Sequence, residues 1–97
     1  MIICEIVSFS EQPSDEVKKL HRQFLREQSE MRKLVMAGRF ADKTGSLMLW
    51  RVGSVKEARE IAMRDPYFRN EVTTFILKEW GVTWDFTATP PVQPKLD

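Results

Sequence analysis

Residues 33–52, KLVMAGRFADKTGSLMLWRV, contain two short apolar runs separated by a polar turn, and this pattern decides the fold. The runs 34–41 and 46–52 are rich in residues that favour strands, and the intervening DKTG is typical of a hairpin turn. We therefore predict an antiparallel pair of strands here, with Gly45 at a turn position that needs a positive φ angle.

Helical patterns flank this hairpin on both sides. Upstream, residues 15–32 (DEVKKLHRQFLREQSEMR) follow a Pro-Ser start signal and carry apolar residues at helical spacing. The predicted inward stripe consists of Val17, Leu20, Phe24 and Met31. Downstream, SVKE from Ser54 is a capping box, and Pro66 ends the helix that it starts. The next segment, DPYF from Asp65, predicts a tight turn or a short helical turn that Asp65 caps.

Two more strands complete the arrangement. Residues 2–9 (IICEIVSF) and 72–80 (VTTFILKEW) are short and rich in strand-forming residues. In 2–9 the apolar residues fall on both alternating sets, which predicts that both faces of this strand are covered. The order is βαββαβ, the ferredoxin-like α+β arrangement, in which two helices pack on one face of a four-stranded antiparallel sheet.

The apolar character of both sheet faces predicts self-association. Residues 47–50 (LMLW) are apolar on consecutive positions, so the face without helices would expose apolar side chains to water. The simplest assembly that covers this face is a two-fold symmetric homodimer with the sheets face to face. We divide the chain into a domain over 1–81 and a proline-bearing extension over 82–97. In that extension, Trp84 and Phe86 could dock on the partner subunit.

Composition restricts the classes of partner. There are 15 basic and 14 acidic residues, and the net charge of +1 gives no overall attraction to nucleic acid or to an anionic membrane. No apolar run approaches the roughly 20 residues of a membrane helix, and the N-terminus has no signal-peptide pattern. The single cysteine, Cys4, excludes an intrachain disulfide and favours a cytoplasmic setting, with a buried strand position as its simplest role.

A pair of polar residues on the inward arc of the first helix is the most informative local feature. His21 and Gln28 lie two turns apart in that arc, beside Phe24. Polar side chains directed at a sheet must find hydrogen-bond partners or line a cavity. His21, the only histidine, can act as a general acid or base near neutral pH. The alternative is a core histidine with satisfied hydrogen bonds.

Three further residues are candidates for the same site. Arg39 can bind a substrate carboxylate with its two-pronged guanidinium, or can lie on the surface at the sheet edge. Asp42 is explained by its turn, and Asp65 by its cap, while Asp65 can alternatively orient His21. The sequence has neither a metal-ligand motif nor a glycine-rich phosphate loop, so we expect no metal and no cofactor.

These segments together resemble the YciI-like (YCII-related) family of the dimeric α/β-barrel group. The matching segments are LHRQFLREQ around His21, KLVMAGRFAD, SVKEAREIAMRDPY and the strand ending in KEW, over roughly residues 1–80. The resemblance implies a ferredoxin-like subunit that dimerises through its sheet, with a cleft between the first helix and the sheet. Arg39 stands where the family commonly has proline, and residues 81–97 extend past the closing strand.

The resemblance also implies a function. The family's motif has a histidine and an aspartate associated with catalysis, which correspond here to His21 and most naturally Asp65, with Asp42 as the alternative. Relatives include enzymes similar to muconolactone isomerase and to dehydrochlorinases of chlorinated aromatics. This implies a cofactor-free isomerase or lyase acting on a small aromatic or lactone acid. The expected substrate-binding residues are Gln28, Arg39, Phe24 and Asp42. The alternatives are a non-catalytic module that binds a small ligand and a structural or regulatory dimer.

Overall fold

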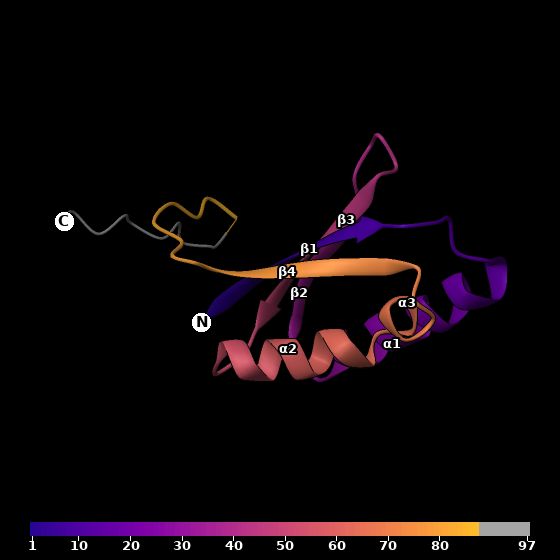
Figure 1. The fold of residues 1–97 in the computed structure, drawn as a ribbon. Coiled ribbons are helices and arrows are strands. Elements are labelled where there is room, and N and C mark those ends of the chain that lie inside the picture. The colour runs from indigo at the N-terminus through magenta and orange to yellow at the C-terminus, as the bar shows by residue number, and fades with distance from the viewer. Residues whose placement is uncertain (88–97) are drawn as a thin grey trace.

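The structure is a computed structural model that describes residues 1–87 of the 97-residue chain. Its elements follow the predicted order, and the segment after Asp65 forms a short helix before the last strand (Figure 1). The elements are β1 (Ile2–Phe9), α1 (Asp15–Glu30), β2 (Leu34–Arg39), β3 (Gly45–Arg51), α2 (Val55–Arg64), α3 (Pro66–Arg69) and β4 (Thr73–Trp80). None of the helices within residues 1–87 is long and apolar enough to cross a membrane.

The four strands form one antiparallel sheet in the order β2-β3-β1-β4. All three helices lie on the same side of this sheet (Figure 1). This arrangement confirms the predicted ferredoxin-like α+β fold. As that fold requires, β1 lies inside the sheet and pairs with β4, which forms one edge.

The core lies between the sheet and the helices. Alternate residues of β1, Ile3 and Val7, point toward the helices and are buried with Met48 and Trp50 of β3. Phe24 of α1 packs against Trp50, with the ring centroids 6.4 Å apart in an edge-on arrangement. This packing fixes α1 over β3 and thereby sets the distance between α1 and the neighbouring strand β2.

The opposite face of the sheet carries apolar side chains that no helix within residues 1–87 covers (Figure 1). We refer to it as the open face, and its apolar residues are Ile2, Cys4, Ile6, Met36, Leu47, Leu49, Ile76 and Trp80. Met36, Ile76 and Trp80 are exposed, and the others are half-buried. Within one chain the helices therefore cover only one face of β1, whereas the sequence predicted cover on both.

The β2–β3 hairpin differs from its prediction at Gly45. The residue with positive φ in this turn is Lys43, at 65°, and Gly45 already belongs to β3. A Cβ atom on Gly45 would lie 1.8 Å from the Val7 carbonyl oxygen of the adjacent strand. Glycine is therefore required here by the close approach of β1, and the prediction that a left-handed turn requires it was wrong.

Helix α1 is shorter than predicted and differently oriented. It ends at Glu30, because Arg32 adopts a φ of 60° and its backbone N–H donates to the Ser29 carbonyl. Leu20 and Met31, assigned to the inward stripe, are 44% and 56% exposed. The buried residues of α1 are instead its two polar ones, His21 and Gln28.

Candidate functional site

The site is built around a hydrogen bond between α1 and the junction of α2 with α3. His21 Nδ1 lies 2.7 Å from Asp65 Oδ1, and both side chains are buried. Because an ionised carboxylate only accepts hydrogen bonds, the geometry assigns the Nδ1 proton to His21 as donor. Asp65 thus orients His21, and the second ring nitrogen, Nε2, is turned away from this partner.

Asp65 is held in place by the turn that it caps. Its Oδ1 also accepts the Tyr67 backbone N–H at 2.9 Å, so the same oxygen caps α3 and binds the imidazole. Pro66 occupies the first position of α3, where its missing N–H costs no hydrogen bond. The sequence D-P-Y therefore fixes the carboxylate by local contacts that do not involve His21. The predicted short helical turn is confirmed.

The Tyr67 ring packs flat on the His21 ring. Their centroids are 3.7 Å apart and the ring planes differ by 6°. On its other side Tyr67 meets the edge of Phe9, at 5.6 Å between centroids. The imidazole is consequently fixed by a hydrogen bond at one nitrogen and by a stacked ring on one face.

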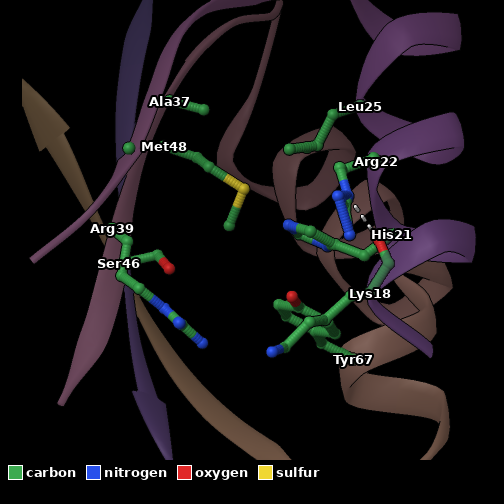
Figure 2. A pocket seen from close by; sticks show the side chains of 10 residues that line it. Lys18, His21, Arg22, Leu25, Ala37, Arg39, Ser46, Met48 and Tyr67 are labelled. Atoms are coloured by element: carbon green, nitrogen blue, oxygen red, sulfur yellow. Dashed lines mark hydrogen bonds between the residues drawn. The ribbon is translucent and has the colours of Figure 1, made fainter. Parts of the chain in front are cut away.

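The imidazole borders a cavity of about 450 Å³ between α1, α3 and the β2–β3 hairpin. Figure 2 shows His21, Lys18, Arg22 and Tyr67 entering it from the helix side and Arg39, Ser46 and Met48 from the sheet side. The remaining lining residues are Leu25, Ala37 and Gly38. The wall is mainly apolar with a few polar groups, as is usual for a small-molecule site.

Three cations surround this cavity. Lys18 and Arg22 come from α1, and Arg39 comes from the end of β2. Lys18 and Arg39 reach toward the same end of the cavity from opposite sides (Figure 2). No acidic side chain is among the lining residues within the described part of the chain, so the cavity favours an anionic ligand.

Two groups near His21 have shifted pKa values. Burial raises the pKa of the Tyr67 phenol, although the Arg39 and Arg22 charges oppose this. The pKa of Glu5 is raised to about 7, mainly by burial and to a smaller extent by the nearby Asp65 carboxylate. The indole N–H of Trp50 donates to Glu5 Oε1 at 3.0 Å and partly offsets the effect of burial.

The structure brings some of the predicted site residues together. His21 and Asp65 are hydrogen-bonded, and Arg39 lines the same cavity. The Arg39 guanidinium also lies 4.8 Å from the centre of the Phe9 ring, and its Nη2 is 3.5 Å from the Gln12 side-chain oxygen. Arg39 is thus both an exposed edge residue and a lining residue.

The other three predicted residues do not line the cavity. Phe24 packs on Trp50, and Gln28 is buried farther along α1, where its Oε1 has no hydrogen-bond partner within residues 1–87. Asp42 lies in the exposed hairpin loop and accepts hydrogen bonds from the Thr44 hydroxyl and backbone N–H. The Thr44 hydroxyl holds the pKa of Asp42 below its usual value. Asp42 is therefore a turn residue, and Asp65 is the aspartate that meets His21.

Several residues that line the cavity were not predicted from the sequence. Lys18 and Arg22 were not among the predicted site residues, yet they lie on either side of His21 at helical spacing i−3 and i+1 and line the cavity. Tyr67 was recognised only as part of the D-P-Y segment. Glu5 had a visible signal, because it is a charged residue between Ile3 and Val7 on the inward face of a strand.

Within residues 1–87, no group of three or more His, Cys, Asp and Glu side chains is arranged to hold a metal ion. Of the extension over 82–97, residues 82–87 belong to the described range and the rest lies outside it. Trp84 and Phe86 stack on each other with centroids 5.7 Å apart, and both are exposed. A second cavity, of about 310 Å³, lies between this segment, Trp80 and Ile2.

Comparisons with known proteins agree with this architecture. The family model for the YCII-related domain matches residues 1–81. A comparison with curated proteins gives no match. Among solved structures, a similar one is the 5-chloro-2-hydroxyhydroquinone dehydrochlorinase of Burkholderia phenoliruptrix AC1100 in complex with 2,5-dihydroxybenzoquinone. It has 17% sequence identity and a TM-score of 0.68, and the match covers 84% of this chain and 94% of that one. At this identity the similarity establishes the fold.

Proposed function

The chain belongs to the YCII-related domain family, and from this premise we propose that it is an enzyme that transfers a proton on a small anionic ring compound. His21 is the base and Asp65 is the residue that orients it. The observation that carries this proposal is the 2.7 Å bond from His21 Nδ1 to Asp65, made by a histidine whose ring borders a cationic cavity.

The proposed mechanism follows from the hydrogen bonds of the imidazole. In the neutral form, His21 keeps its proton on Nδ1 and donates a hydrogen bond from there to Asp65. The lone pair is then on Nε2, the nitrogen available to the cavity. A substrate C–H or O–H proton moves to Nε2, and Asp65 stabilises the imidazolium that forms. Return of the proton to another atom gives an isomer, whereas loss of a leaving group gives a lyase product.

The proposed substrate class follows from the charge and size of the cavity. Lys18, Arg22 and Arg39 support binding of a carboxylate or an oxyanion. A volume of about 450 Å³ suits a single-ring compound such as an aromatic or lactone acid. The similar dehydrochlorinase was solved with a small oxygenated ring, which supports the same class for this chain.

We propose the remaining features of the working protein on separate grounds. No cofactor is needed for a proton transfer by His21. Two copies pair through the open face, because apolar sheet faces of this size are normally covered. Residues 1–81 form the catalytic domain, and Trp84 and Phe86 of the extension dock on the partner subunit. The single cysteine supports a cytoplasmic setting.

The proposal is tested by hydrogen exchange at carbon. Small ring ketones, lactone acids and phenols are incubated with the protein in D₂O, and deuterium incorporation is followed by NMR. We expect His21→Gln to abolish the exchange, and Asp65→Asn to slow it by roughly a hundred- to ten-thousandfold. Asp42→Asn is the matched control, since it changes the other candidate aspartate, and should leave the rate unchanged.

The tautomer of His21 provides a second readout that needs no substrate. Because it is the sole histidine, its two ¹⁵N signals are assigned without ambiguity. In the neutral ring we expect Nδ1–H with an unprotonated Nε2, and a larger share of the Nε2–H form in Asp65→Asn. A compound that binds in the cavity but returns unaltered and unexchanged would favour the non-catalytic binding module instead.

A further inference from the structure

The Tyr67 hydroxyl is a second functional group on the cavity wall. Tyr67 is only 7% exposed, yet its hydroxyl makes no hydrogen bond to any residue in the described range. Figure 2 shows this oxygen at the cavity end of the ring, beside the side chains of His21 and Lys18. A hydroxyl that opens on a cavity and has no partner in the described range is a candidate to bind a ligand.

We propose that Tyr67 is a second catalytic residue whose hydroxyl donates a proton to a substrate oxygen while His21 removes a proton from a neighbouring carbon. The inference rests on the proposed function, and it narrows the substrate class to anionic ring compounds that also carry an enolisable ketone beside a carbon–carbon double bond, or to the corresponding phenols. The carbonyl oxygen of such a compound would lie against Tyr67, and its acidic carbon against Nε2 of His21.

The proton balance closes without any other reactant. The substrate C–H bond breaks and an N–H bond forms on His21, while the Tyr67 O–H bond breaks and the substrate oxygen gains the proton. The resulting enol returns its proton to Tyr67 as His21 delivers its own to a conjugated carbon. The products are an isomerised ketone and the original state of both side chains.

The surroundings of Tyr67 suit this cycle. Burial keeps the pKa of the phenol above its usual value, so the hydroxyl is protonated and able to donate at the start. The Arg39 and Arg22 charges act in the opposite direction, and they stabilise negative charge on this oxygen or on the substrate oxygen bound to it. The flat stack at 3.7 Å keeps the phenol and imidazole rings parallel, so one planar ligand can meet both.

A purely structural role for Tyr67 makes a different prediction. Stacking on His21 and contact with Phe9 use only the ring, so phenylalanine would serve equally well. The backbone N–H that binds Asp65 is also independent of the side chain. Tyr67→Phe therefore removes the hydroxyl alone, and Tyr67→Leu removes both the hydroxyl and the stack.

The test uses two single-ring anions of similar shape, para-nitrophenolate and para-nitrobenzoate, with binding measured by absorbance and by calorimetry. The phenolate oxygen mimics the enolate, whereas the carboxylate is a ligand for the cations. We expect Tyr67→Phe to weaken phenolate binding by roughly ten- to a hundredfold and benzoate binding by less than about threefold. Arg39→Gln should weaken both probes, with the exposed Arg59→Gln as its charge-matched control.

The possible outcomes distinguish the role proposed for the Tyr67 hydroxyl from the proposed function of His21 as the base. Unchanged phenolate affinity in Tyr67→Phe, or an equal loss for both probes, overturns the role of the hydroxyl while leaving His21 as the base. If deuterium exchange also persists undiminished in Tyr67→Phe, the hydroxyl is not catalytic. If neither probe binds the wild-type protein and no compound exchanges, both the proposed function and the inference fail. The ¹⁵N signals of His21 in Tyr67→Phe report whether the Asp65 bond is intact.

Discussion

Glu5 and Asp65 are two carboxylates on the helix side of the sheet with different local environments. Asp65 has a histidine and a backbone N–H as donors to one oxygen, whereas Glu5 has the Trp50 indole N–H. An indole donor offsets only part of the cost of burying a charge. At the residue scale, Asp65 thus has two hydrogen-bond donors in its site, whereas Glu5 has one indole donor and a pKa raised to about 7 by burial.

Glu5 predicts a pH-dependent stability. Its pKa is about 7 in the folded protein, against an ordinary value of 4.5, so the folded state binds this proton more tightly than the unfolded state. Proton binding by Glu5 therefore stabilises the folded state. This contribution to the free energy of unfolding is complete below pH 4.5 and is lost as the pH rises to about 7, and it amounts to about 3 kcal/mol. Urea unfolding between pH 5 and 8 measures this contribution.

The variant Glu5→Gln removes the titration and keeps an acceptor for Trp50. We expect it to unfold with a free energy that varies less with pH, and to exceed the wild type in stability at about pH 8. Glu60→Gln, on the exposed side of α2, is the control and should follow the wild type. A wild-type stability that is constant or increases over this range would contradict the assignment.

Helix α1 shows why one half of the site could be predicted from sequence and the other could not. The placement of His21 and Gln28 on the inward arc is confirmed, because helical periodicity fixes angular position. The centre of that arc was predicted from the apolar residues. Compared with the structure, the predicted centre lies too close to Leu20, which is exposed, and too far from Leu25, which lines the cavity. Where a helix buries polar groups over a cavity, an average over apolar residues alone displaces the inward arc to one side, here toward the exposed Leu20, although both polar residues stay within it.

The elements themselves were predictable because each carries its own local signals. The hairpin, both caps and the D-P-Y turn are determined by short-range chemistry, and all four are present. The role of Gly45 was not, since it depends on contact with β1, which is distant in sequence. The same holds for Lys18 and Tyr67, which meet the predicted Arg39 only when α1, β2 and α3 assemble.

The β2–β3 hairpin gives a prediction that compares two of its glycines. In Gly45→Ala the new methyl group would lie 1.8 Å from the Val7 carbonyl oxygen, so β1 and β3 must separate. We expect a loss of more than about 3 kcal/mol in the free energy of unfolding, measured in urea. Gly38→Ala is the matched control, because no atom lies within 4 Å of its Cβ position.

Gly38→Ala should leave stability unchanged or raise it by about 0.5 kcal/mol, since alanine restricts the unfolded chain. Equal effects of the two substitutions would show that the hairpin tolerates separation from β1.

At the scale of the whole molecule, the apolar surface divides into a covered and an uncovered layer. The helices cover one face of the sheet and bury its centre, whereas the open face leaves Met36, Ile76 and Trp80 exposed. Trp84 and Phe86 add further apolar surface near the Trp80 end of β4. A surface of this kind is more typical of a subunit interface than of a monomer.

The predicted homodimer is tested by a charge placed on that face. The wild-type chain, of 11.4 kDa, should sediment at twice its mass, and Ile76→Lys should sediment as a monomer. Met63→Lys, at a similarly exposed apolar position on α2, is the control and should remain dimeric. A wild-type protein that is monomeric at all concentrations would contradict the pairing.

The sheet order has a consequence for how the chain is made. Of the four strands of this sheet, β1 is synthesised first, yet it occupies an interior position and needs both β3 and β4 as neighbours. Its apolar segment IICEIVSF therefore keeps an unpaired edge until Thr73–Trp80 has been synthesised. During translation this segment is the natural target for a chaperone, and slow decoding before β4 would lengthen its exposure to aggregation.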